Sequence, residues 1–149
     1  VTKIKLVTDT DLTGRIYQHI PQAKFASAPE RHHIPLVLAG GAVAAGGRRV
    51  DKLASQTDLG ATLLSMMGIP YRELRYSRDI FDEETAPVAV FTEPSLIGII
   101  TPSDTLVYNP DADAVVAARG REPYPGEVSP LLPAAKAFLR DLYSTLGSL

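Results

Sequence analysis

The sequence predicts an α/β fold in a single domain, and three observations lead to this prediction. A continuous apolar run, "IPLVLAGG" at 34–41, has the composition of a strand that is buried on both faces of a parallel sheet. A helix with clear start and stop signals follows at 55–68. The last third of the chain alternates short apolar runs with turn residues and then ends in an amphipathic segment.

The first predicted element is a strand at 3–8, where lysines alternate with apolar residues before "LVT". Residues 12–32 have no clean period and contain two prolines, which indicates an irregular loop. The run at 34–41 is then the second parallel strand. The glycine-rich stretch "AGGAVAAGG" at 39–47 is expected to connect this strand to the helix.

The helix is the most clearly marked element of the chain. Ser55 can cap it, and Asp58, three residues later, can complete a capping box. Gly68 and Pro70 are a conventional helix stop. One apolar stripe runs along the helix and is expected to face the core: Leu59, Leu63, Met66 and Met67.

The second half predicts an antiparallel meander and a closing helix. The segment "PVAVFTE" at 87–93 reads as a strand, and 96–118 reads as two or three short antiparallel strands with "TPSD" and "NPDAD" as their turns. Residues 129–147 have the period of an amphipathic helix. Its predicted apolar face consists of Leu131, Leu132, Ala135, Phe138, Leu139, Leu142, Tyr143 and Leu146.

Composition excludes several classes of function. The 149 residues carry a net charge of −2, so no electrostatic field favours nucleic acid or an anionic membrane. The absence of cysteine excludes disulfides and thiolate metal sites. No apolar run approaches the roughly 20 residues that span a bilayer, so this segment is expected to be soluble and free of membrane contact. Because a strand is predicted almost at Val1, we expect the chain to be a piece of a larger protein.

Two small groups of residues could bind a ligand. Asp9 and Asp11 follow the first strand and share a face in extended geometry, which suits a hard cation; an Asp/Thr-rich turn is the alternative. His32 and His33 could bind a metal or an anion, although adjacent residues of an extended chain point to opposite faces. The glycines at 39–47 match neither the dinucleotide nor the Walker pattern, so a nucleotide-binding domain has no further support.

Three motifs in the middle of the chain occur in a fixed order at close spacing: "HHIPLVLAGGAV", "LASQTDLGATLLSMMGIPY" and "YSRDIFDEE". Together they resemble the C-terminal part of the sulfatase domain in the lipoteichoic acid synthase and phosphoglycerol transferase branch of the alkaline phosphatase superfamily. The matching positions are 33–36, 55–64 and 77–80. The "SQTD…TLL" block is the most specific of these, and the likeness extends from residue 4 to about 146.

The resemblance implies the C-terminal portion of an alkaline-phosphatase-like sandwich, with parallel strands and a helix, then a small meander and a closing helix. It also implies a metal-dependent sulfatase-like hydrolase, or a phosphoglycerol- or phosphoethanolamine-type transferase, that acts on phosphate or sulfate esters. The family nucleophile, a Thr or Ser, would lie upstream of this chain, so no catalytic nucleophile is assigned here. Mn²⁺ or Mg²⁺ is expected as the cofactor rather than Zn²⁺ or Ca²⁺.

The resemblance also assigns site residues. The family keeps an Asp-His metal-binding pair at a strand end, and its Asp falls on Asp9, while Thr10 stands where the family has His. Asp11 replaces a glycine and could supply an oxygen ligand to the metal. His33 or His32 would line the pocket for the substrate anion, because the strand they precede borders that pocket in the family.

Several expectations follow for the intact protein and for this piece. The parent would lie outside the cytoplasm, anchored by upstream transmembrane helices, and this piece alone would be inactive. Parallel strands without their neighbours would leave exposed edges, through which the piece could associate with itself. The alternative is a non-catalytic, degenerate member of the superfamily that serves as a binding or structural module, and the missing His favours it.

Overall fold

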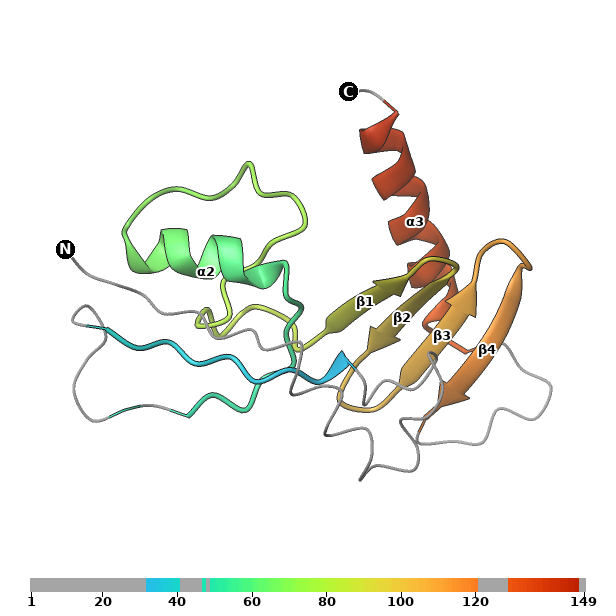
Figure 1. Ribbon diagram of the computed structural model, residues 1–149, viewed down its shortest axis with the longest axis horizontal. Helices are drawn as coiled ribbons and strands as arrows, with labels where there is room; N and C mark the ends of the chain where they lie inside the picture. The colour runs from blue at the N-terminus through green and yellow to red at the C-terminus, as the bar shows by residue number, and fades with distance from the viewer. Residues whose placement is uncertain (1–31, 41–46, 48, 121–128, 148–149) are drawn as a thin grey trace. The chain divides into compact units, whose positions relative to one another are not determined.

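The computed structural model describes residues 32–40, 47, 49–120 and 129–147. The chain divides into two compact units, Val1–Asp51 and Lys52–Leu149, and each is described by itself. The predicted strand at 3–8 and nearly all of the predicted loop at 12–32 lie outside the described residues. All the helices and strands described below belong to the second unit (Figure 1).

The predicted parallel strand at 34–41 is wrong for the residues that the structure describes. Residues 34–40 have no helix or strand, and the side chains of Ile34, Leu36 and Val37 are exposed. A parallel strand requires a hydrogen-bonded neighbour, and every described strand pairs in an antiparallel ladder with strands of the second unit. The apolar run at 34–40 therefore has strand composition without strand pairing.

The predicted helix is confirmed as α2 (Asp58–Met66). It begins three residues after Ser55, because its N-cap is Thr57, which makes no side-chain capping bond. Half of the expected capping box is present, since the Asp58 carboxylate accepts a hydrogen bond from the Ser55 N–H at 2.8 Å. Gly68 ends the helix with a φ of 70°, a backbone conformation that glycine adopts without strain.

The buried face of α2 is not the apolar stripe that the sequence predicts. Asp58, Ala61 and Thr62 are buried, whereas Met66 and Met67 are 41% and 58% exposed. The prediction that these methionines belong to the core is therefore wrong. The face of α2 that carries Asp58, Ala61 and Thr62 packs inward, because the buried Asp58 carboxylate must lie against its hydrogen-bond donors.

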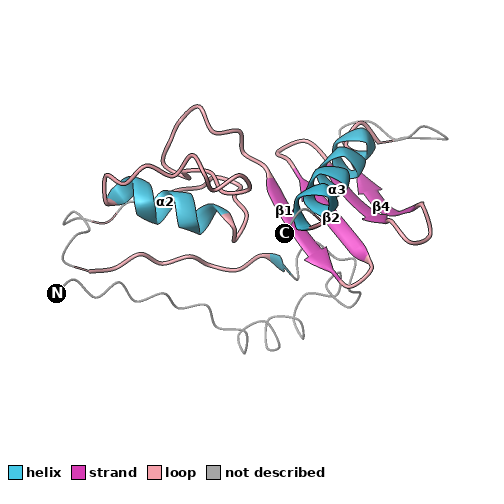
Figure 2. Ribbon diagram, turned by 90° about the horizontal axis from the view of Figure 1, so that it is seen from above, coloured by secondary structure: helices cyan, strands magenta, loops and turns pink. Residues whose placement is uncertain are grey.

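The predicted meander is confirmed as a four-stranded antiparallel sheet in the order β1-β2-β3-β4 (Figures 1 and 2). The strands are β1 (Ala89–Glu93), β2 (Leu96–Ile100), β3 (Thr105–Asn109) and β4 (Ala114–Arg119). The "TPSD" turn joins β2 to β3, where the Thr101 N–H bonds to the Asp104 carbonyl at 2.8 Å. Together with the helices, this sheet is consistent with the α/β class.

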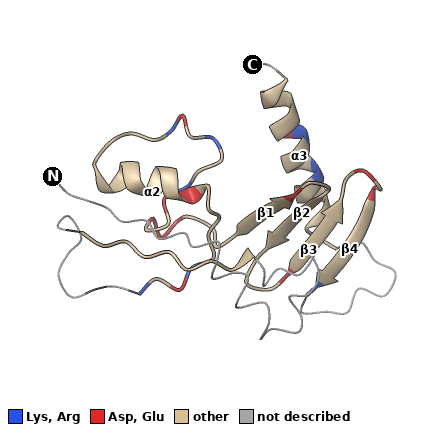
Figure 3. Ribbon diagram, viewed as in Figure 1, with Lys and Arg blue, Asp and Glu red and all other residues tan. Residues whose placement is uncertain are grey.

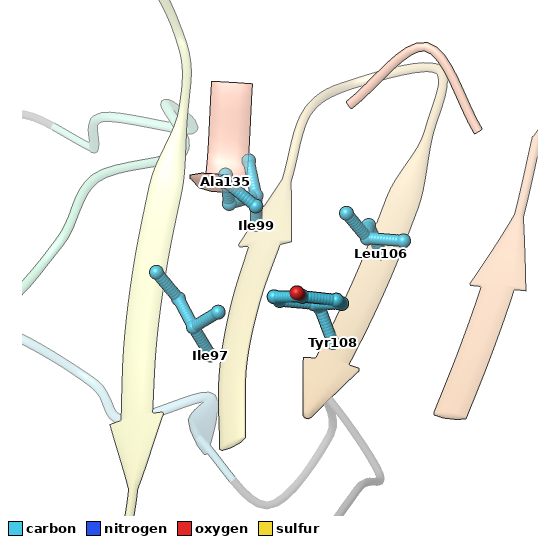
Figure 4. Packing of buried hydrophobic residues seen from close by; sticks show 5 residues of the cluster. All are labelled: Ile97, Ile99, Leu106, Tyr108 and Ala135. Atoms are coloured by element: carbon cyan, nitrogen blue, oxygen red, sulfur yellow. The ribbon is translucent and has the colours of Figure 1, made fainter. Parts of the chain in front are cut away.

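The closing helix is confirmed as α3 (Leu132–Leu146), which crosses one face of the sheet (Figure 2). The core between α3 and the sheet consists of Ile97, Ile99, Leu106, Tyr108 and Ala135, the last of which belongs to α3 (Figure 4). Leu131, Leu132, Phe138 and Leu139 pack against this cluster, as the predicted apolar face requires. The same prediction is wrong for Tyr143 and Leu146, which are 62% and 56% exposed.

A glycine in β2 allows an aromatic ring to cover the sheet. Gly98 is paired directly with Phe91 of β1, and a Cβ atom added to Gly98 would lie 2.0 Å from the Phe91 ring. The ring therefore occupies the space that a side chain at Gly98 would need. This arrangement resembles the aromatic rescue of glycine in designed sheets, in which a cross-strand ring protects the bare backbone.

None of the helices in the described part of the chain is long and apolar enough to cross a membrane.

Candidate functional site

The most elaborate polar arrangement in the second unit surrounds the carboxylate of Asp58 at the start of α2. Asp58 is only 1% exposed. Its Oδ1 accepts hydrogen bonds from the backbone N–H and the Nε of Arg78, at 2.9 and 3.0 Å. Its Oδ2 accepts from Arg78 Nη2 at 2.7 Å and from the Ser55 N–H at 2.8 Å. These four hydrogen bonds offset the free-energy cost of removing the carboxylate charge from water.

Arg78 extends this arrangement to the chain that enters the sheet. Its Nη1 donates to the Ala86 carbonyl at 3.1 Å, and its Nη2 also donates to the Val88 carbonyl at 2.7 Å. The planar guanidinium can bind a carboxylate and two carbonyls at once, which a lysine ammonium cannot do with the same geometry. Arg78 therefore joins the start of α2 to the segment that precedes β1.

The hydroxyl groups of Ser55, Thr62 and Ser77 add further hydrogen bonds around the ion pair. We call the whole set the helix-start network: Ser55, Asp58, Thr62, Ser77 and Arg78. The Thr62 Oγ1 donates to the Asp58 carbonyl at 2.7 Å and accepts from the Ile80 N–H at 3.0 Å. The Ser77 Oγ accepts from the Ala61 N–H in the first turn of α2 at 2.7 Å. The Ser55 Oγ accepts from the Val90 N–H of β1 at 2.8 Å.

The helix-start network is suited to holding the backbone and not to catalysis. Each oxygen of the Asp58 carboxylate already accepts two hydrogen bonds, so binding a metal there would displace partners from a buried charge. The predicted helix-start role of Asp58 agrees with these contacts, whereas the predicted capping role of Ser55 is wrong, because the N-cap is Thr57 and the Ser55 Oγ accepts from the Val90 N–H. The role of Arg78 was not predicted, although "SRD" was part of the motif.

Of the four residues predicted to bind metal or substrate, the structure describes only His32 and His33. Asp9 and Asp11 lie outside the described residues, so the prediction of a metal site there stays a prediction. His32 is half-buried, and His33 is exposed. Among the residues that the structure describes, no group of three His, Cys, Asp or Glu side chains could hold a metal ion.

A second polar cluster links the turn before β4 to α3. Asp113 Oδ1 accepts from the Tyr108 hydroxyl and from Lys136 Nζ, both at 2.6 Å. The hydrogen bond from Lys136 lowers the pKa of Asp113, and the hydrogen bond to Asp113 raises the pKa of both Tyr108 and Lys136. Both members of the ion pair are largely solvated, so this cluster is an attachment of the turn and not an enclosed site.

A third cluster attaches the loop after α2 to the second half of α3. The Asp141 carboxylate accepts from Arg75 Nη2 and, at 2.9 Å, from the Tyr76 hydroxyl. The Tyr76 ring meets Phe138 edge-on, with the ring centroids 5.6 Å apart. Within the described residues, β2 and β3 carry no charged side chain, and charges of both signs lie mainly in the connecting segments and on α3 (Figure 3).

No protein-family model, curated protein or solved structure matches this chain. The resemblance to the sulfatase domain therefore rests on the three sequence motifs.

Proposed function

We propose that this chain is the C-terminal part of a sulfatase-like domain. The parent would be a metal-dependent hydrolase, or a phosphoglycerol- or phosphoethanolamine-type transferase, that acts on phosphate or sulfate esters. The observation that supports this proposal is the helix-start network. It is built from residues of the two motifs that carry most of the resemblance, "SQTD…TLL" and "SRDI".

The network gives these two motifs a physical connection across a sequence separation of twenty residues. Asp58 of the first motif binds Arg78 of the second, and Thr62 of the first binds the Ile80 N–H of the second. Because the Asp58 carboxylate is buried, loss of either Asp58 or Arg78 would leave the other charge without its partner, so the fold needs both residues. A chance likeness of unrelated sequences would not require the matched residues to contact one another, so this pairing favours a shared architecture.

The chemistry of the parent would depend on residues at the end of the first predicted strand. Asp9, Thr10 and Asp11 offer only oxygen ligands, a donor set that fits Mg²⁺ or Mn²⁺ better than Zn²⁺. Such an ion supplies Lewis-acid stabilisation of the transferring phosphoryl or sulfuryl group. Asp9 would be the principal ligand in this chain, and His33 or His32 would contact the substrate anion. The nucleophile would come from upstream, so this piece alone would be inactive.

The test uses the full protein encoded by the reading frame that contains this chain. We expect millimolar Mn²⁺ to raise its melting temperature and to support cleavage of a chromogenic phosphodiester or aryl sulfate. Asp9→Asn should abolish both effects. Asp51→Asn is the matched control, because the Asp51 carboxylate is exposed and its bonds are to Arg49. A parent in which Asp9→Asn retains full activity would contradict the assignment of Asp9.

The second candidate is a degenerate, non-catalytic module that binds a glycan or another protein. Thr10 favours this candidate, because a neutral hydroxyl is a far poorer metal ligand than the imidazole it replaces. In this case the parent shows neither a Mn²⁺-dependent thermal shift nor ester cleavage. Thr10→His would then restore a Mn²⁺-dependent thermal shift if the rest of the metal site is intact.

A further inference from the structure

We draw no further inference here: the strongest candidate, the exposed apolar surface at the end of α2 formed by Met66, Met67 and Ile69, carries nothing because no contact in the described part of the chain shows what covers it.

Discussion

Two neighbouring regions of the second unit are held together by different kinds of contact. In residues 52–88, α2 and the loop after it are joined by the ion pair of the buried Asp58 with the half-buried Arg78 and by the Thr62 and Ser77 hydroxyl groups. In the sheet and α3, the buried cluster is made mainly of aliphatic side chains (Figure 4). Apolar periodicity thus describes the second region well and the first region poorly.

The difference determines how each region responds to substitution. Removing one partner of a buried ion pair leaves a charge without compensation, and this costs more than most lost contacts. Removing part of an aliphatic side chain leaves a cavity whose cost depends on how far the neighbours relax. We therefore expect the largest effects of conservative changes in the polar region, although it has fewer buried side chains.

Arg78→Met is expected to have the largest effect. It leaves the Asp58 carboxylate buried without its cation, which should reduce the free energy of unfolding by about 3–5 kcal/mol. Urea denaturation followed by circular dichroism measures the change. The matched control is Arg75→Met, because Arg75 pairs with Asp141 at the surface and should contribute less than about 1 kcal/mol.

The double variant Asp58→Leu/Arg78→Met tests the same idea from the opposite direction. It removes both charges, so its loss of stability should be smaller than the sum of the losses in Asp58→Leu and Arg78→Met, with a coupling free energy of about 1 kcal/mol or more. Additive losses in the two single variants would show that the pair does not act as a unit. Equal stability of Arg78→Met and Arg75→Met would contradict the burial of the Asp58 charge.

Gly98→Ala should disturb the apolar region by about 1–3 kcal/mol, because the new Cβ would overlap the Phe91 ring. Phe91→Leu/Gly98→Ala should recover part of this loss by removing the ring. Gly60→Ala provides the comparison, since its Cβ would meet the tip of the Leu74 side chain at 3.2 Å and alanine favours the helix. If Gly98→Ala unfolds at the same urea concentration as the unaltered chain, the ring does not lie on Gly98.

The sequence predicts the sheet and α3 because the side chains of the cluster between them recur at simple periods. Ile97 and Ile99 alternate along one strand, and Ala135, Phe138 and Leu139 recur at helical spacing, so pattern and core coincide. The same reasoning assigns the wrong face to α2, because the stripe that ends at Met66 and Met67 is the more apolar one. A buried Asp58 is unfavourable by hydropathy and becomes favourable only through Arg78, twenty residues away.

The candidate site is less predictable than the fold for a related reason. Asp58 could be assigned to a helix start from local spacing alone. The partner of Ser55 Oγ is the N–H of Val90, a contact that depends on where the sheet packs and not on local sequence. For the metal site, Asp9 and Asp11 lie outside the described residues, so their prediction still rests on spacing and on the family resemblance.

Thr62→Val should cost about 1–3 kcal/mol, because the Ile80 N–H loses its acceptor, the Thr62 hydroxyl, which is fully buried. Thr62→Ser keeps the hydroxyl and should retain most of the stability, apart from the cost of one missing methyl group. The comparison separates hydrogen bonding from side-chain volume at a fully buried position. Equal destabilisation by the two variants would assign the effect to packing, and the polar region would then resemble the apolar one.

The smallest expected effect concerns the solvated cluster of Asp113, Tyr108 and Lys136. Because Lys136 lowers the pKa of Asp113 in the folded state, this carboxylate stabilises the fold above its unfolded pKa, and the contribution is lost as pH falls through the lower folded value. The pKa of Tyr108 is raised, so its contribution is present below its unfolded pKa and is lost as pH rises through the folded value.

Asp113→Asn removes the carboxylate whose hydrogen bond raises the pKa of Tyr108, so that pKa should fall toward its ordinary value. The absorbance titration of the tyrosines, compared with that of Tyr108→Phe, identifies the group that moves. Asp111→Asn, which alters an exposed carboxylate in the same turn, should leave that titration unchanged. Because the cluster is solvated, Asp113→Asn should shift the titration clearly while changing the urea midpoint at neutral pH only slightly. In the helix-start network, by contrast, removing one charge should lower the urea midpoint strongly, because there water cannot replace the lost partner.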